Sequence, residues 1–311
     1  MSTKPRILLI ADVRDWIFER HCFYISDILK DHFLFNVSYH RENFGYYFDE
    51  DAYDLIYPLE FNLLHPNKNI NPQKCVTGIR SHSSWGDWNY TEDLKAYLEN
   101  KFSLIHVVSE ELNNIFQPLL SSDKYAGVVQ HGVDPSLFKP STRQQNADHP
   151  EKEILDIGWA GNRGAASNKG FDDIIKPLES LQNVRLNFCG YSDNNLTKED
   201  MVKFYQSIDT YVCASSKEGH NNSLMEAAFC ENSIITTDNG TVSEYLKDEE
   251  NALIVNREAS SFISAVEKLR DDADYRLSLG KKARSSAVEK FDWNIKALEY
   301  KAMFEKALSE V

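Results

Sequence analysis

Short apolar runs of strand length alternate with amphipathic segments of helix length along the chain, and this alternation constrains the fold more than any other feature. In the first half, strands are predicted at residues 7–10, 35–39, 54–59, 75–79, 104–108 and 126–129. Helices are predicted at 17–29, 91–100 and 110–120. Strands separated by helices are typical of a parallel α/β sheet. Residues 1–139 are therefore predicted to form one α/β domain.

A polar stretch without apolar periodicity follows, and the alternation then restarts. Residues 140–153, PSTRQQNADHPEKE, have the composition of a linker. Beyond it, strands are predicted at 155–160, 184–189, 210–214, 233–237 and 252–255, and helices at 171–181, 198–207, 223–230, 260–270 and 275–290. Residues 154–292 are thus a second predicted α/β domain, and a helix within 293–311 is expected to return to the first. Ligands are expected beyond the carboxyl ends of the strands, in a cleft between the domains.

Composition excludes several classes of protein. Of the 311 residues, 42% are hydrophobic and 26% are charged, which is typical of a globular protein with a sizeable core. The net charge of −14 disfavours generic nucleic-acid binding. No apolar run is long enough for a membrane-spanning helix or a secretory signal, so a cytoplasmic protein is expected. The five cysteines are odd in number and widely spaced, which predicts reduced core residues.

The most informative segment is 215–226, SSKEGHNNSLME, which leaves a predicted strand and opens a predicted helix. Its first helical turn presents backbone N–H groups that, with the helix dipole, favour an anion such as a phosphate. Glu218 and Glu226 flank this turn, and carboxylates accept hydrogen bonds from sugar or ribose hydroxyls. Two alternatives stay open at this point. Glu226 also fits a capping box with Ser223, and Glu218 also fits a solvated loop charge.

A second glycine-containing loop lies at 158–171, GWAGNRGAASNKGF, again between a strand and a helix. Gly161 permits close approach of a ligand, and Arg163 and Lys169 are suited to clamp a diphosphate. The loop is neither a dinucleotide-binding fingerprint nor a Walker A loop. An ordinary surface turn is the alternative.

Together and in this order, these segments resemble the retaining family-4 glycosyltransferases. EGHNNSLMEA and SIITTDNGTVSEYL are similar to that family's E-x7-E region, and GNRGAASNKGFDDII is similar to its donor-phosphate loop. VVSEELNNIF and VVQHGVDPSLFKP resemble segments that close its first domain, and FDWNIKALEY resembles its terminal helix. The resemblance spans residues 75–305. It implies a GT-B fold, in which two Rossmann-like domains with parallel sheets face each other across a cleft.

The resemblance also implies a role for each matched residue. Glu226 would hold the ribose hydroxyls of a nucleoside diphosphate sugar, and Glu218 would contact the transferred sugar. Arg163 and Lys169 would neutralise the leaving diphosphate, and His82 would lie beside the reacting sugar. The remaining donor-binding positions implied are Gly161, Gly219, His220, Asn221, Asn222, Ser223 and Leu224. For His82, an ordinary histidine with satisfied hydrogen bonds is the alternative.

Several departures from the family pattern concern the acceptor side. The usual Gly-Gly loop after the first strand is replaced by ADVRDWIFER at 11–20, and residues 229–233, FCENS, lack the usual Gly and Pro. His131 stands where Asn is typical, and His220 occupies an unusual place beside the sugar site. None of these changes removes a charge needed for the donor. They leave the sugar and the acceptor unassigned.

The reaction implied is retaining transfer from a nucleoside diphosphate sugar, without a metal or a cofactor, to a saccharide, lipid-linked or small-molecule acceptor. Trp85, Trp88 and Tyr90 are candidates for an acceptor wall, with core packing as the alternative. The acidic groups at 49–51 and at Asp272 and Asp274 resemble a metal motif, but a solvated face is the favoured interpretation. The net charge indicates no polybasic membrane patch, which leaves local peripheral contact open.

Two other functions stay open at the level of sequence. A sugar-nucleotide epimerase of the same fold would act on the donor without an acceptor. A catalytically inactive protein would bind the nucleotide sugar without turnover. A nicotinamide-dependent dehydrogenase is a third and weaker hypothesis, because the loop at 158–171 lacks the dinucleotide-binding fingerprint.

Overall fold

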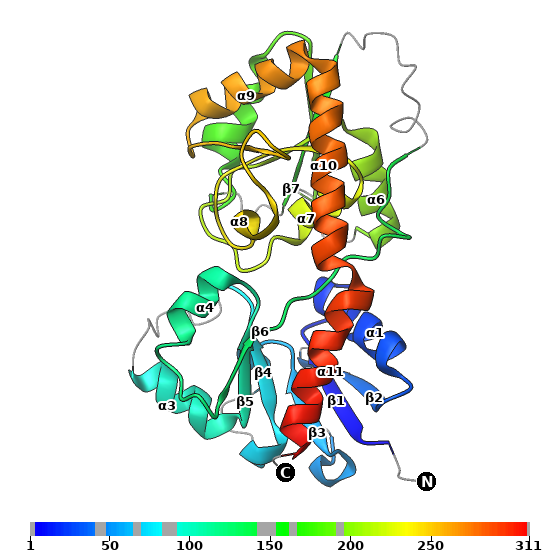
Figure 1. The fold of residues 1–311 in the computed structure, drawn as a ribbon, viewed down its shortest axis with the longest axis vertical. Coiled ribbons are helices and arrows are strands. Elements are labelled where there is room, and N and C mark those ends of the chain that lie inside the picture. The colour runs from blue at the N-terminus through cyan, green and yellow to red at the C-terminus, as the bar shows by residue number, and fades with distance from the viewer. Residues whose placement is uncertain are drawn as a thin grey trace. The chain divides into compact units, whose positions relative to one another are not determined.

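The structure is a computed structural model that describes residues 4–40, 48–64, 70–82, 92–141, 154–161, 167–190 and 196–309. The chain divides into two compact units (Figure 1). The first contains Met1–Gly132 and Trp293–Val311, and the second contains Val133–Asp292. The chain therefore passes from one unit to the other twice.

The first unit is built on parallel strands, as its apolar runs predict. Its strands are β1 (Arg6–Ala11), β2 (Leu34–Tyr39), β3 (Leu55–Pro58), β4 (Val76–Ile79), β5 (Leu104–Val107) and β6 (Tyr125–Val128). They form two three-stranded sheets in the orders β2-β1-β3 and β4-β5-β6. A parallel bridge between Ile56 and Cys75 connects the two sheets. Strands β3, β4 and β5 are buried along their whole length, which is typical of parallel strands covered on both faces.

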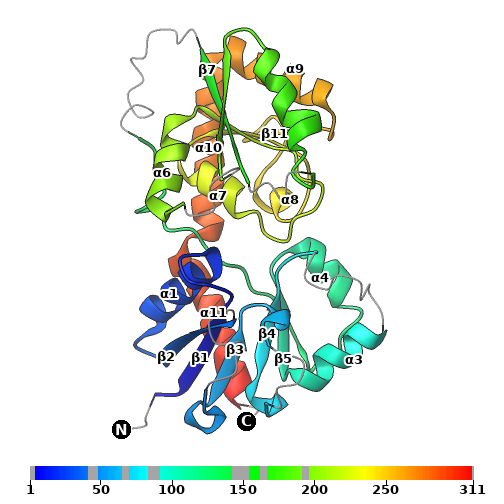
Figure 2. The same ribbon diagram turned by 180° about the vertical axis from the view of Figure 1, so that it is seen from behind.

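Helices from both ends of the sequence cover these sheets (Figure 2). The first unit's helices are α1 (Ile17–Leu29), α3 (Glu92–Lys101), α4 (Glu110–Phe116) and α11 (Trp293–Ser309), with short 3-10 turns η1 (Glu50–Ala52), η2 (Phe61–Leu63) and η3 (Pro72–Lys74). Helix α11 packs on α1, where the rings of Trp293 and Tyr24 stack at 5.3 Å. Phe304 lies edge-on to Tyr57 of β3, with 5.5 Å between ring centroids. The last helix is therefore part of the first unit's core.

The second unit is a five-stranded parallel sheet with helices. Its strands are β7 (Leu155–Ala160), β8 (Val184–Cys189), β9 (Thr210–Cys213), β10 (Ser233–Thr236) and β11 (Leu253–Ile254), in the order β11-β10-β9-β7-β8. Its α-helices are α6 (Lys198–Ser207), α7 (Asn222–Phe229), α8 (Val242–Tyr245), α9 (Ala259–Asp271) and α10 (Ala273–Phe291). The predicted α/β class with parallel sheets is confirmed. Among the helices that the structure describes, none is both long and apolar enough to cross a membrane.

The helix predicted over 171–181 is wrong in its detail. Residues Phe171–Ile175 (η6) form a wide π-helical turn, and Lys176–Ser180 (η7) form a 3-10 helix. The N–H groups of Ile174 and Ile175 both donate to the carbonyl of Gly170. Pro177 has no N–H to continue an α-helical ladder, so the segment tightens into 3-10 geometry.

The second unit begins before the predicted linker. The N–H of Val133 donates to the carbonyl of Phe291 at 2.8 Å, at the point where α10 ends. This bond holds the first residue of the unit against its last helix. Residues 142–153 of the predicted linker lie outside the described part of the chain.

Candidate active site

Strand order brings the two predicted loops together. From β7 the chain moves to β8 on one side, and β9 then pairs with the other side of β7. The strand order therefore reverses between β7 and β9, and open α/β sheets bind ligands beyond the carboxyl ends of the strands at such a point. Lys169 lies in the segment after β7, and Glu218 lies in the loop after β9.

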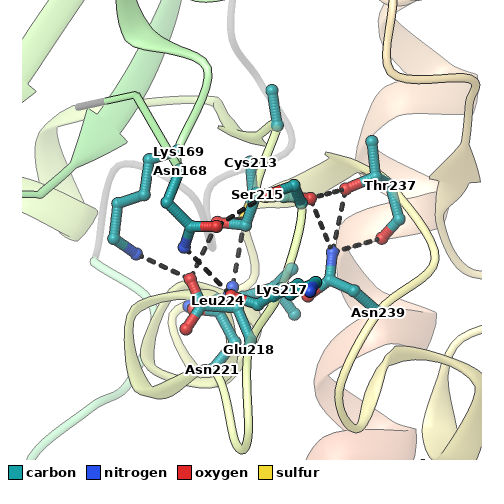
Figure 3. Close-up of polar contacts among 12 residues, drawn as sticks. Asn168, Lys169, Cys213, Ser215, Lys217, Glu218, Asn221, Leu224, Thr237 and Asn239 are labelled. Atoms are coloured by element: carbon teal, nitrogen blue, oxygen red, sulfur yellow. Dashed lines mark hydrogen bonds and ion pairs between the residues drawn. The ribbon is translucent and has the colours of Figure 1, made fainter. Parts of the chain in front are cut away.

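Lys169 and Glu218 form an ion pair at this edge (Figure 3). The Lys169 Nζ donates to Glu218 Oε1 at 3.0 Å, and the two side chains are 17% and 19% exposed. Burial alone would lower the pKa of Lys169, but the charge of Glu218 outweighs burial and raises that pKa above its usual value. Lys169 therefore stays charged across the neutral range. Glu218 is therefore not the solvated loop charge that sequence left as an alternative.

A second layer of polar groups fixes Glu218 (Figure 3). The Ser215 hydroxyl donates to Glu218 Oε1 at 2.8 Å. The Ser215 carbonyl accepts from Thr237 Oγ1 at 2.6 Å and from Asn239 Nδ2 at 3.1 Å. Gly240, at φ +57°, lies so close that an added Cβ would stand 3.1 Å from the Glu218 carbonyl. Sequence reasoning missed Ser215, Thr237 and Asn239, although all three follow the carboxyl ends of neighbouring strands.

Asn168 and Arg257 join the same two loops through the backbone. Asn168 Nδ2 donates to the Lys217 carbonyl at 3.0 Å, and Asn168 Oδ1 accepts from Ser216 Oγ at 2.6 Å. Arg257 Nε donates to the Ala214 carbonyl at 2.9 Å, and its Nη2 donates to the carbonyl of residue 167 at 3.0 Å. These contacts set the spacing between Lys169 and Glu218. Arg257 was not predicted, because it lies far along the chain from both loops.

Helix α7 begins beside Glu218, as predicted, but its cap differs from the expected one. Asn221 is the N-cap, and its Oδ1 accepts from the Leu224 N–H at 3.2 Å. Asn221 Nδ2 donates to Cys213 Sγ at 3.0 Å, which anchors the cap to the end of β9. The N–H groups of Asn222 and Ser223 therefore open the helix, where its dipole favours an anion. His220, just before the cap, is buried against the ring of Phe291 with 5.0 Å between centroids.

Glu226 does not form the capping box with Ser223 that the sequence left open. Its side chain is buried, and Oε2 accepts from the Tyr205 hydroxyl at 3.0 Å. Asn and Ser are equally good N-caps, and Asn221 takes the N-cap position two residues before Ser223. The capping-box alternative for Glu226 is therefore wrong.

Gly161 is required for the path of Lys169. The Gly161 N–H donates to the Cys189 carbonyl at 3.0 Å, which holds it at the end of β7. An added Cβ would stand 2.7 Å from Lys169 Cδ and from the Trp159 ring. Gly219 and Leu224 lie on the loop and helix already described. The predicted cation Arg163 lies outside the described residues.

His82 belongs to the first unit, where its Nε2 lies 2.9 Å from Glu111 Oε1. Nearby in sequence, the buried guanidinium of Arg80 donates from Nη2 to the hydroxyls of Tyr57 and Tyr300, at 2.8 and 2.9 Å. His131, which stands where the family that the sequence resembles has Asn, is buried and stacks on His21 at 4.1 Å. The predicted acceptor residues Trp85, Trp88 and Tyr90 lie outside the described residues.

Glu19 organises the segment at 11–20, where the family that the sequence resembles has a Gly-Gly loop. Asp15 takes a left-handed conformation with φ 57°, and its N–H donates to Glu19 Oε2 at 2.7 Å. Glu19 Oε1 accepts from the Tyr39 hydroxyl at the end of β2. The first strand therefore leads into α1 through a turn held by a carboxylate rather than by glycine.

The acidic groups considered as metal ligands cap helices. Asp49 accepts from the Asp51 N–H at the start of η1, and Asp272 accepts from the Tyr275 N–H at the start of α10. Within the described ranges, no group of three or more His, Cys, Asp or Glu side chains is placed to hold a metal ion. Metal independence stays a prediction.

Comparison with known sequences agrees with the position of this site. The family model of group 1 glycosyl transferases matches residues 156–272, which include both loops and α7. An N,N'-diacetylbacillosaminyl-diphospho-undecaprenol alpha-1,3-N-acetylgalactosaminyltransferase of Campylobacter jejuni is 27% identical over 43% of this chain and 34% of the relative. An MMP alpha-(1->4)-mannosyltransferase of Mycolicibacterium hassiacum is 24% identical over 67% of this chain and 55% of the relative. The matches thus span a third to about half of these relatives' length.

Solved structures match the fold over nearly the whole chain. Sucrose-phosphate synthase of Thermosynechococcus elongatus superposes with a TM-score of 0.77 at 15% identity, covering 99% of this chain and 100% of that one. HepE of Anabaena, in complex with UDP and glucose, superposes with a TM-score of 0.71 at 14% identity, covering 97% and 99%. At this level of identity the likeness shows the fold.

Proposed function

We propose that this chain, which has a GT-B fold and carries a group 1 glycosyltransferase domain at 156–272, transfers a sugar from a nucleoside diphosphate sugar to an acceptor. The observation that carries the proposal is the Lys169–Glu218 pair at the reversal of strand order, beside the first turn of α7. A cation and helix N–H groups suit a diphosphate, and a carboxylate suits sugar hydroxyls. Because HepE is solved in complex with UDP and with UDP-glucose, UDP is the first donor nucleotide to test.

The chemistry follows from the charges that develop during transfer. Breaking the bond from sugar to phosphate builds negative charge on the departing diphosphate. Lys169 and the N–H groups at the start of α7 would stabilise that charge, and each well-placed donor contributes about 3 kcal/mol to such a transition state. Glu218 would hold hydroxyls of the sugar ring, and Glu226 would hold the ribose. Arg163 and His82 keep the roles that the sequence resemblance implies.

We also propose that transfer retains the configuration of the sugar and needs no metal ion, as the family resemblance implies. In such a reaction the acceptor attacks from the face that the diphosphate leaves, and a phosphate oxygen takes the acceptor's proton. Proton NMR of the first-formed product checks the anomeric configuration. Full activity in excess EDTA checks metal independence, and loss of activity that Mg²⁺ or Mn²⁺ restores would contradict it.

The two alternative functions are not favoured. Both curated relatives named above are transferases by name, and one of the structural neighbours is a synthase by name. An acceptor wall at Trp85, Trp88 and Tyr90 and a cytoplasmic location stay predictions.

A ligand panel tests the proposal directly. The purified chain is heated with UDP, GDP, ADP and their sugars, and the melting temperature is recorded. A ligand at about 100 times its Kd should add roughly 2.7 kcal/mol of stability, and hence a clear rise in Tm. Lys169→Met should remove most of the rise, while Lys176→Met, an exposed cation on the neighbouring η7, should keep it. No rise with any ligand would refute the proposed function.

A further inference from the structure

Glu226 shares its carboxylate with a tyrosine that no sequence motif indicates. Tyr205 lies on α6, and its side chain is fully buried. Its hydroxyl donates to Glu226 Oε2 at 3.0 Å, across the interface between α6 and α7. The bond therefore joins two residues that lie 21 positions apart in the sequence and on different helices.

The phenol is held rigidly by its surroundings. The Tyr205 ring packs edge-on against Tyr211 of β9, with 5.9 Å between centroids. Asn232 Nδ2 donates to the carbonyls of Tyr205 and Ile208, at 3.0 and 2.9 Å, which fixes the end of α6. The position of the hydroxyl is thus set by the core. A side chain needed only to fill this space would not require a hydroxyl.

We propose that Tyr205 is a positioning residue, which fixes the plane of the Glu226 carboxylate so that it accepts from the ribose hydroxyls of the donor nucleotide. This inference rests on the proposed function, because it assigns the ligand of Glu226. A glutamate side chain has three rotatable bonds, and holding Oε2 fixes the direction in which the carboxylate accepts. The two neighbouring ribose hydroxyls need an acceptor of defined direction.

The proton of this bond stays on the tyrosine. Burial, with the charge of Glu226 nearby, raises the pKa of Tyr205 well above its usual value. Tyr205 is therefore a hydrogen-bond donor throughout the neutral range. A buried carboxylate oxygen without a donor would be costly, so the Tyr205 hydroxyl also satisfies Glu226 Oε2 inside the protein.

The test compares ribose with deoxyribose. Calorimetry measures the Kd of whichever of UDP, GDP and ADP binds best, and of its 2'-deoxy and 3'-deoxy forms. We expect the wild type to prefer the ribonucleotide, and Tyr205→Phe to lose about tenfold of that preference while binding the deoxy forms as before. Tyr211→Phe removes a hydroxyl from the same core and should keep the preference.

The other outcomes separate failure of the positioning role of Tyr205 from failure of the proposed function. An equal loss for ribose and deoxyribose forms in Tyr205→Phe, or no loss, would overturn the positioning role. A wild type that binds a nucleotide without preferring ribose would also overturn it. A wild type that binds none of the three nucleotides would refute the proposed function instead.

A second variant tests the same coupling from the other partner. Glu226→Gln should lose the ribose preference, and adding Tyr205→Phe to it should change the preference no further. Additive losses would overturn the inference. This cycle also applies if Tyr205→Phe proves poorly folded, because Tyr205→Met can then replace it and must show the same lack of additivity.

Discussion

The Lys169–Glu218 pair gives the sharpest test of the site, because each charge is the other's main partner in the second unit. At 3.0 Å, the direct attraction is about 5.5 kcal/mol at an effective dielectric constant of about 20. Burial of both groups offsets much of this, and a hydrogen bond between charged groups contributes a net 1.5–3 kcal/mol, approximately. Lys169→Met should therefore destabilise the second unit by about 2 kcal/mol, because it removes the cation and leaves Glu218 with the Ser215 hydroxyl as its side-chain donor among the described residues. Glu218→Gln keeps an acceptor and should cost about 1 kcal/mol.

Urea unfolding measures these effects in the correct unit. Trp159 is the one tryptophan in the sequence of the second unit, so its resonance in fluorotryptophan-labelled protein reports on that unit. The double variant Lys169→Met/Glu218→Gln removes both charges and should lose less stability than the two single variants added together. Unchanged unfolding in Lys169→Met, or fully additive losses, would refute the assignment of a coupled pair.

The difference in unfolding free energy between wild type and Lys169→Met should depend on pH in a defined direction. The pKa of Lys169 is raised in the folded protein, so the folded state holds this proton more tightly than the unfolded chain does. The stability advantage of wild type over Lys169→Met should be constant from pH 6 to about pH 10.5 and should be lost as the pH rises further. An advantage that instead declined from pH 9 to pH 6 would contradict the charge assignment.

Three further predictions address other residues. Gly161→Ala should weaken nucleotide binding about tenfold in calorimetry, because its Cβ would displace Lys169; unchanged affinity would contradict the close approach. Gly280→Ala places a Cβ 2.2 Å from the Glu231 backbone carbonyl and should lower the unfolding free energy by about 1–3 kcal/mol in urea titration. Burial, with Arg80 nearby, lowers the pKa of His106 to about 3, so the first unit should lose up to about 1.4 kcal/mol per pH unit below about pH 6.5. The unfolding free energy of His106→Gln, measured by urea titration at several pH values, should lack this pH dependence. An equal dependence in His106→Gln would contradict the assignment to His106.

The strands could be predicted because buried parallel strands have a simple signature, a short apolar run between polar turns. Their order is not a local property, so the meeting of Lys169 with Glu218 followed only from the family resemblance. The same limit explains why Ser215, Thr237 and Asn239 were missed, since they converge only when β9 and β10 are neighbours. The segment after Gly170 was mispredicted for a local reason, because its apolar spacing suits an α-helix and Pro177 does not. The cap at Asn221 rather than Ser223 was ambiguous, because both residue types cap helices well.

The two crossings between the units have a consequence for synthesis on the ribosome. Residues 133–292 are contiguous, so this part can complete its own core while translation is still in progress. The first unit needs Trp293, Tyr300 and Phe304, which emerge after residues 133–292, although its strands emerge before them. The strands of the first unit therefore lack helix α11 while the second unit folds. Nascent-chain proteolysis should detect this inverted order of maturation.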